Sequence, residues 1–570
     1  MMKTKVIILI TYSLFLITSL SSCSDFWDPE SDDMINGNDY IANNTEMYTG
    51  FLGIMTKMQE VGDKEILLTE TRGELVEPTA NSLPELISLY NYDSNLQGNS
   101  YADPAGWYEV IIACNDYLAK MKEYKNNPDL DEEKYKDLVA STVRVKIWAY
   151  KTLGEIYGKA YWFDDPITKV EAIKNEVNFK LMDMEQISDQ CLALCNGGYE
   201  GIELNRDLDW AKWLDPDQAL AESAYRKWNT MVPAYAGLYA ELNLWKGAYL
   251  DSKSQDATSY YKAAADILLD GLTKIWSNQV GSAGTSSSFP YCMPNAHVPG
   301  SYRTVWENAQ PYPLECISAI IYDYTKNQTN SLLKHFSKEY PNQYLLAPSA
   351  AGEARFLDGK FNPGGEGGGT RYNTCFGNAS GGGRYIAKFR REGSSVRSNA
   401  YQDDVHVYTY RGTQYHTLLI EALNHLKRFT AMDAVMNKGV LSSVLTDDVK
   451  DLPEWEGFND YWTGRVWSKY PNNGLRGCYT LTARDMKVEV LSADVPAAMR
   501  HNDLQVLDET ILEFACEGKV YPTMNRMAVR YNDPSIVADR VCPKYEATGR
   551  AEAIRAKIMD GGYWVNYQIQ

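Results

Sequence analysis

The chain has 570 residues and a formal net charge of −19, and it is rich in aromatic residues, with 41 Tyr and 14 Trp. The acidic balance argues against a nucleic-acid-binding protein, because such proteins carry basic patches. It suits a soluble face that projects from a membrane.

The first residues have the pattern of an export signal. Lys3 and Lys5 precede an apolar run at residues 6–20. This run is shorter than the about 20 residues that span a bilayer, so it predicts a secretory signal and not a membrane span. It ends in Leu-Ser-Ser-Cys at 20–23, an order that resembles a bacterial lipobox. The resemblance implies cleavage before Cys23 and lipidation there, a stable anchor when several acyl chains are attached. The alternative is an ordinary signal peptide with an incidental cysteine.

An acidic segment follows the cysteine. It carries Asp25, Asp28, Glu30, Asp32 and Asp33. Acidic residues at this place resemble the surface-export signal of Bacteroidetes lipoproteins. We therefore divide the chain into a signal peptide at 1–22, an acidic tether at 23–40 and one domain at 41–570.

The segment 129–158 predicts a long helix, with Asp129 and Glu132 as a capping box. It also reproduces the aromatic, Leu-Gly and Tyr order of a first tetratricopeptide helix. The residues in that order are Tyr150, Leu153, Gly154 and Tyr157. The glycine would let a neighbouring helix approach closely, although one copy of so short a pattern is weak evidence.

Further helical periodicity predicts hairpins near 107–160, 215–276 and 411–440. Long stretches rich in Gly, Pro, Ser, Asn and Tyr separate them. Such long loops in a compact domain are often functional. The sequence thus predicts a mainly α fold of tetratricopeptide-like helical hairpins with long irregular insertions. We place these insertions near 62–105, 281–315 and 320–400.

The sequence offers no catalytic or metal-binding pattern, so we expect no enzyme activity, metal or cofactor. Cys191 and Cys195 lie one helical turn apart without a nearby histidine, and buried small hydrophobes are the better interpretation. Adjacent carboxylates, such as Asp403 and Asp404, are poor glycosidase candidates, because a glycosidase places two carboxylates across a bond.

Four patches in consistent order resemble the SusD/RagB family of outer-membrane nutrient-binding lipoproteins. The first is the lipobox with its acidic sequel. The other three contain Trp107, Ile111 and Asn115; Arg411, Glu421, Ala422, Leu423 and Asn424; and Glu509, Glu513, Phe514, Glu517, Gly518 and Lys519. The chain departs from the family pattern at Gln414, Thr510, Val520 and Thr523, although Arg526 remains. We interpret these positions as structural, since helix ends and buried ion pairs hold repeats together.

The resemblance implies a lipid-anchored protein that faces the cell exterior at the outer membrane. It would capture an oligosaccharide or another nutrient and deliver it to a SusC-like TonB-dependent transporter. A peptide-binding member of the same family is one alternative. A surface glycoside hydrolase and a non-nutrient structural surface protein are the others.

In the family, ligand-binding groups come mainly from the insertions. Here these would be Arg72, Tyr90, Asn91, Tyr92, Asn95, Tyr302, Trp306, Tyr312, Tyr324, Tyr340 and Tyr344. Rigid aromatic rings suit the apolar face of a sugar. We expect Trp306, Tyr90 and Tyr92 to be the foremost exposed rings. The alternative is that Tyr90 packs in the core with Leu86 and Leu89, and that Arg72 pairs with Glu74 or Glu77.

Overall fold

The structure is a computed structural model. It describes residues 41, 43–167, 179–206, 230–282, 301–307, 315–358, 369–390, 402–440, 444–458, 474–477 and 486–567. Cys23, Tyr312 and the acidic tether lie outside the described residues.

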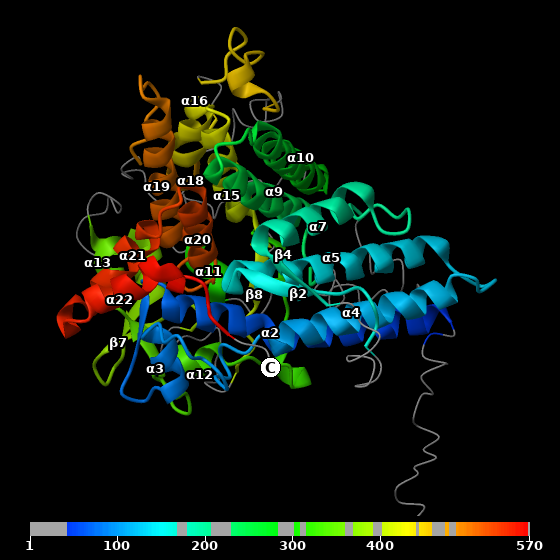
Figure 1. The fold of residues 1–570 in the computed structure, drawn as a ribbon, viewed down its shortest axis with the longest axis horizontal. Coiled ribbons are helices and arrows are strands. Elements are labelled where there is room, and N and C mark those ends of the chain that lie inside the picture. Colours follow the sequence, from blue (N-terminus) through cyan, green and yellow to red (C-terminus); the bar gives the residue numbers. More distant parts are fainter. Residues whose placement is uncertain are drawn as a thin grey trace, which may run out of the picture.

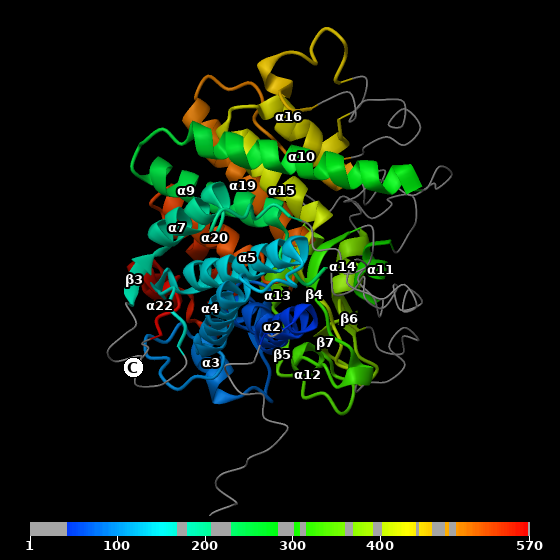
Figure 2. The ribbon, with the colours of Figure 1, turned by 90° about the vertical axis from the view of Figure 1, so that its right-hand side faces the viewer.

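Helices dominate the described chain, as the sequence predicts (Figure 1). The long ones are α2 (Asn44–Arg72), α4 (Ala105–Tyr124), α5 (Glu132–Tyr157), α7 (Met184–Gly197), α9 (Tyr235–Ser252), α10 (Thr258–Ser282), α15 (Gly412–His425), α19 (Val495–Glu513) and α20 (Val520–Arg530). In Figure 2, α10, α9, α7, α5 and α4 follow one another from top to bottom, each in contact with the next. This stack is the expected tetratricopeptide-like array.

Shorter helices lie between and after these. They are α3 (Pro84–Tyr90), α11 (Ser301–Glu307), α12 (Leu332–Phe336), α13 (Ala350–Leu357), α14 (Gly369–Cys375), α16 (Phe429–Asp433), α18 (Gly474–Gly477), α21 (Ser535–Val541) and α22 (Ala551–Lys557). The 3-10 and π turns are η3 (Tyr324–Lys326), η4 (Ala434–Lys438), η5 (Pro453–Trp455), η6 (Cys542–Thr548) and η7 (Ile558–Gly562).

Helix α5 shows how the sequence sets these elements. It begins at Glu132, where the Asp131 side chain accepts a hydrogen bond from the Lys134 amide, and it ends at Gly158 in the left-handed conformation. The cap is therefore Asp131 and not the predicted Asp129. A Cβ added at Gly154 would lie 2.2 Å from the Met184 sulfur at the start of α7. The glycine thus allows the close helix approach that the tetratricopeptide pattern predicts.

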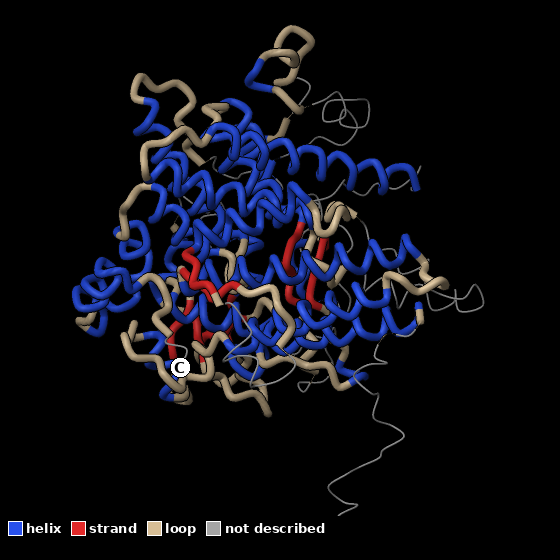
Figure 3. The backbone as a smooth tube through the Cα atoms, turned by 45° about the vertical axis from the view of Figure 1, so that its right-hand side comes forward, coloured by secondary structure: helices blue, strands red, loops and turns tan. Residues whose placement is uncertain are grey.

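The described strands are short and form two-stranded antiparallel sheets among the helices (Figure 3). The pairs are β1 (Val76–Pro78) with β5 (Leu346–Pro348), β2 (Lys159–Trp162) with β3 (Lys180–Asp183), β4 (Cys316–Ile320) with β8 (Val407–Arg411), and β6 (Phe376–Asn378) with β7 (Arg384–Ile386). The β1–β5 pair joins the insertion near 62–105 to the insertion near 320–400. Two predicted ligand-facing regions, distant in sequence, therefore meet.

Cys191 and Cys195 are buried on α7, as interpreted from their spacing. Burial raises the pKa of both thiols. Among the described residues, no helix is long and apolar enough to cross a membrane. Within the same residues, no group of three or more His, Cys, Asp or Glu side chains is arranged to hold a metal ion.

Candidate functional site

The residues of the sequence patches form a buried ionic core. Arg411 contacts Glu513 at 2.8 Å and Glu517 at 2.9 Å, and Glu315 at 3.2 Å. All four side chains are at most 4% exposed. Arg411 ends β8, while Glu513 ends α19, so the cluster connects this strand to helix α19. Removing one partner of such a buried pair leaves an uncompensated charge, which is strongly destabilising.

A second ionic cluster lies between α15, α19 and α20. Arg526 donates to both carboxylate oxygens of Glu421, at 2.9 and 2.6 Å. Arg530 contacts Glu421 at 2.6 Å and Asp503 at 2.8 Å. These contacts support the structural interpretation of Glu421 and Arg526. Both carboxylates of this cluster are thus held in ion pairs.

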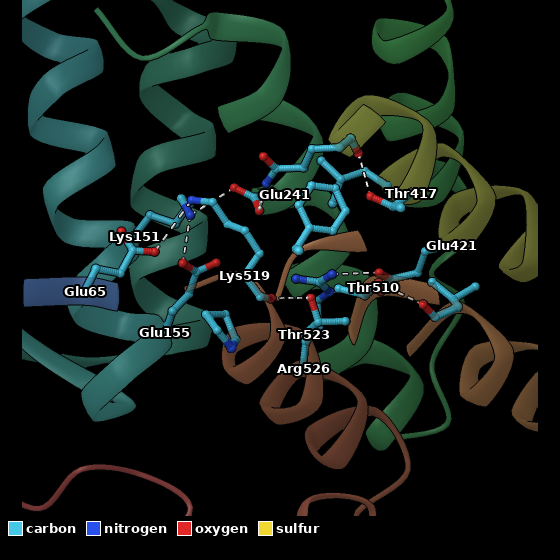
Figure 4. A pocket seen from close by; sticks show the side chains of 15 residues that line it. Glu65, Lys151, Glu155, Glu241, Thr417, Glu421, Thr510, Lys519, Thr523 and Arg526 are labelled. Atoms are coloured by element: carbon cyan, nitrogen blue, oxygen red, sulfur yellow. Dashed lines mark hydrogen bonds and ion pairs between the residues drawn. The ribbon is translucent and has the colours of Figure 1, made fainter. Parts of the chain in front are cut away.

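A small polar cavity lies beside this cluster (Figure 4). Lys151 lies between Glu155 at 2.7 Å and Glu241 at 2.9 Å on its wall. The cavity leaves ≈ 20 Å³ for the centre of a water-sized sphere. Ligand pockets usually enclose about 300–1,000 Å³. A sugar therefore does not fit, and the cavity is not the nutrient site.

In the first insertion, Arg72, Tyr90 and Tyr92 are buried, so the expectation that Tyr90 and Tyr92 are exposed is wrong. The Arg72 guanidinium lies 4.0 Å from the centre of the Tyr92 ring and donates to the Tyr521 hydroxyl at 3.1 Å. Within the described chain, Arg72 makes no ion pair with Glu74 or Glu77. The turn-like composition of this segment suggested an exposed loop, but its side chains pack against the rest of the domain.

Tyr90 is 5% exposed and packs in the core with Leu86 and Leu89, as the alternative interpretation held. Its ring lies 4.6 Å from that of Tyr545. Asn91 is half-buried and accepts a hydrogen bond from Arg550. Only Asn95 of the five predicted residues in this insertion is exposed.

Tyr302 and Trp306 lie on α11 and are 0% and 4% exposed. The expectation that Trp306 is an exposed platform is therefore wrong. Its ring centre lies 4.1 Å from the Lys388 ammonium, which itself contacts Glu517 at 2.6 Å. Both rings pack against the Lys388 ammonium of the ionic core. The Gly and Pro residues around them in the sequence had instead suggested an exposed loop.

The exposed aromatic candidates come from the insertion near 320–400. Tyr340 is 83% exposed at a turn closed by a hydrogen bond from the Asn342 amide to the Glu339 carbonyl. Tyr324 is 38% exposed. Tyr344 is half-buried, with its ring centre 4.9 Å from the Lys338 ammonium.

The segments 79–87 and 338–344 lie against each other, and we call them the junction surface. Thr79 donates to the Tyr344 carbonyl at 2.6 Å, and the Asn81 amide donates to the Gln343 carbonyl at 3.0 Å. Leu83 and Ile87 are 39% and 41% exposed on the same segment. The surface thus combines an exposed ring with amide groups and apolar patches.

Sequence reasoning missed several residues that shape both regions. Glu315 and Lys388 belong to the ionic core and Arg530 belongs to the second ionic cluster, and all three come from distant segments without a shared local pattern. Asn81 and Lys338 belong to the junction surface. Their only sequence signal is their position in predicted insertions, beside aromatic residues.

The helical stack and its insertions define a tetratricopeptide-like helical-repeat protein. Known structures with a similar fold include SusD-like proteins. A SusD superfamily protein from Bacteroides vulgatus has a TM-score of 0.59 at 9% identity, over 92% of this chain and 95% of that chain. A SusD homolog from Bacteroides thetaiotaomicron has a TM-score of 0.57 at 12% identity, over 93% and 97%. A laminarin-binding SusD-like protein has a TM-score of 0.53 at 13% identity, over 88% and 94%.

No family model matches the chain, and no curated protein matches its sequence. The agreement over most of both chains nevertheless shows the fold. This chain has the SusD-like fold, and the resemblance found in the sequence is confirmed at that level.

Proposed function

We propose that this protein binds a glycan at the cell surface through its junction surface and hands it to a SusC-like TonB-dependent outer-membrane transporter. The observation that carries the proposal is the SusD-like fold, shared over 88% of the chain with a protein described as laminarin-binding. The protein acts by binding, without catalysis.

Tyr340 is the central residue of the proposed site, because its ring is 83% exposed. A flat ring can stack on the apolar face of a sugar and loses little entropy on binding. Asn81, Asn342 and Lys338 offer polar groups to the hydroxyls along the same segments. Tyr324, Tyr344 and Asn95 are secondary candidates. The open surface buries only part of a ligand, so we expect dissociation constants on the order of micromolar to millimolar.

Anchoring and partnership complete the proposal. Cleavage before Cys23 and lipidation there would tether the domain to the outer membrane by its acidic segment. The support is the lipobox-like order at 20–23. In a Bacteroidetes host, Cys23→Ala should release the protein from membranes. A membrane-bound variant would contradict the proposal. Affinity purification from outer membranes should recover a large β-barrel protein.

Calorimetry of the purified chain against oligosaccharide and peptide panels tests the binding proposal. The Tyr340→Ala variant should bind a responding glycan about tenfold more weakly, or ~1.4 kcal/mol. Tyr161→Ala is the matched control, because Tyr161 is 37% exposed on the separate β2–β3 sheet. Binding of peptides alone would favour the peptide-binding alternative. Release of reducing sugar from the glycan would favour a hydrolase.

A further inference from the structure

The cavity of Figure 4 is lined by polar groups that lack partners. The Gln414 side chain is 4% exposed, and its amide nitrogen donates to Glu241 at 3.4 Å. Its carbonyl oxygen, Oε1, is buried and accepts no hydrogen bond from the described residues. A buried acceptor without a partner is costly, at about 1–3 kcal/mol.

Two charged groups on the same wall are only loosely paired. Lys519 and Glu65 form an ion pair at 3.7 Å, which is too long for a hydrogen bond. Their side chains are only 13% and 8% exposed. Within the described part of the chain, no hydrogen bond forms to the Lys519 ammonium or to the Glu65 carboxylate.

The three threonines that line the cavity cannot satisfy these acceptors. Thr417, Thr510 and Thr523 each donate their hydroxyl hydrogen to a backbone carbonyl of their own helix or its first turn, at 2.8–2.9 Å. Their oxygens can therefore offer only lone pairs to the cavity. The wall needs an occupant that donates to Gln414 and Glu65 and accepts from Lys519.

A water molecule meets both requirements. The ≈ 20 Å³ open to its centre exceeds the roughly 10–15 Å³ that one water needs, and buried waters typically make about three hydrogen bonds. An added cation is disfavoured, because Lys151, Lys519 and Arg526 already pair with the carboxylates of the lining.

We propose that this cavity is a binding site for one structural water molecule that bridges Gln414 Oε1, the Glu65 carboxylate and the Lys519 ammonium. The three residues come from α15, from α2 and from the residue before α20. The water thus joins three segments that lie far apart in sequence. Gln414, Thr510 and Thr523, which depart from the family pattern, all line the site. Short neutral side chains at 510 and 523 leave room for the water.

A crystal structure of the unmodified chain, at a resolution that shows ordered water, tests the site directly. We expect one peak within hydrogen-bonding distance of all three groups. Two results would overturn the proposal: a site without a peak, where Lys519 bonds directly to Gln414, or a peak whose scattering and short contacts identify a metal ion.

A double-mutant cycle provides a second test. Gln414→Met and Lys519→Met should be non-additive by at least about threefold in the unfolding equilibrium constant, because the two side chains share the water. The control cycle pairs Gln414→Met with Lys246→Met, since Lys246 contacts Glu185 and Asp189 elsewhere and should give additive effects. Additive behaviour of the Gln414 and Lys519 pair would refute a shared water. If either variant fails to fold, the crystal structure of the unmodified chain still decides.

Discussion

The Tyr92 hydroxyl donates a hydrogen bond to the backbone carbonyl of Arg72, while the Arg72 guanidinium lies over the Tyr92 ring. Two residues predicted to contact a ligand thus contact each other. Arg72 also donates to the Gly562 carbonyl near the C-terminus. Their role is to close the end of α2 against the C-terminal segment.

Tyr92→Phe should therefore lower the free energy of unfolding by about 1 kcal/mol, because the substitution removes one buried hydrogen bond and keeps the ring. Glycan binding should not change. Urea unfolding and calorimetry measure the two effects. Asn95→Ala, at an exposed position of the same insertion, is the control and should leave stability within about 0.5 kcal/mol. Weaker glycan binding by a fully folded Tyr92→Phe variant would contradict this assignment.

Trp306→Ala should cost about 3–5 kcal/mol of stability, since the ring is 4% exposed and covers the Lys388 ammonium. A thermal melt should show a markedly lower midpoint. Tyr340→Ala is the comparison, and its melt should match that of the parent, because an exposed ring contributes little to the core. Equal midpoints for both variants would show that the Trp306 ring is not buried in solution.

Glu421 makes stability depend on acid pH. Burial alone would raise the pKa of Glu421, but the ion pairs with Arg526 and Arg530 outweigh it and lower the pKa to about 2. A lowered pKa means that the folded chain favours the charged carboxylate. The contribution is present above the unfolded pKa of about 4.3 and is lost as the pH falls towards 2.

We therefore expect Glu421→Gln to lose about 3–5 kcal/mol at pH 7 and to show a smaller deficit at pH 3, in urea unfolding. Glu132→Gln serves as the control, because Glu132 pairs with Lys136 on the surface and should change little. If the loss of stability in Glu421→Gln did not depend on pH, the negative charge of Glu421 would not be what stabilises the fold.

His425 has the opposite pH dependence. Burial and the nearby Arg530 oppose its charging, but Asp503 at 2.9 Å and Asp251 at 3.2 Å outweigh them and raise its pKa. The folded chain thus favours the charged imidazolium. This contribution is full below the unfolded pKa of about 6.5 and is lost as the pH rises through the folded pKa.

His425→Gln should accordingly destabilise the chain more at pH 6 than at pH 9, by denaturant unfolding. His501→Gln is a suitable control, because His501 bonds to a backbone carbonyl at an exposed position. A larger loss of stability at pH 9 than at pH 6 would contradict the expected pH dependence and would exclude a charged His425 in the folded protein.

Local patterns predicted the helical part of the fold well. The periodicity of α5 and the glycine that admits α7 depend on neighbours within a few turns, and such signals are visible in a single sequence. The third and fourth family-like patches also predicted buried ion pairs, which Arg411 and Arg526 form.

The candidate site was less predictable, because exposure depends on tertiary contacts. Trp306 and Tyr340 both lie among loop-forming residues, yet one faces Lys388 and the other faces solvent. Nothing within ten residues of Trp306 indicates Lys388 or Glu517. No local pattern indicates the pairing of β1 with β5 either. The two strands lie some 270 residues apart in sequence, and their pairing brings the two segments of the junction surface together.

The C-terminal segment has a consequence for the order of folding. Lys544 donates to the Thr71 carbonyl at 2.9 Å, and the Tyr545 hydroxyl donates to the Tyr90 carbonyl. The first insertion therefore acquires these contacts only from a segment that follows it by more than 450 residues along the chain. Closure of the first insertion is thus a late step in folding, because it must wait until a segment far along the chain has been made.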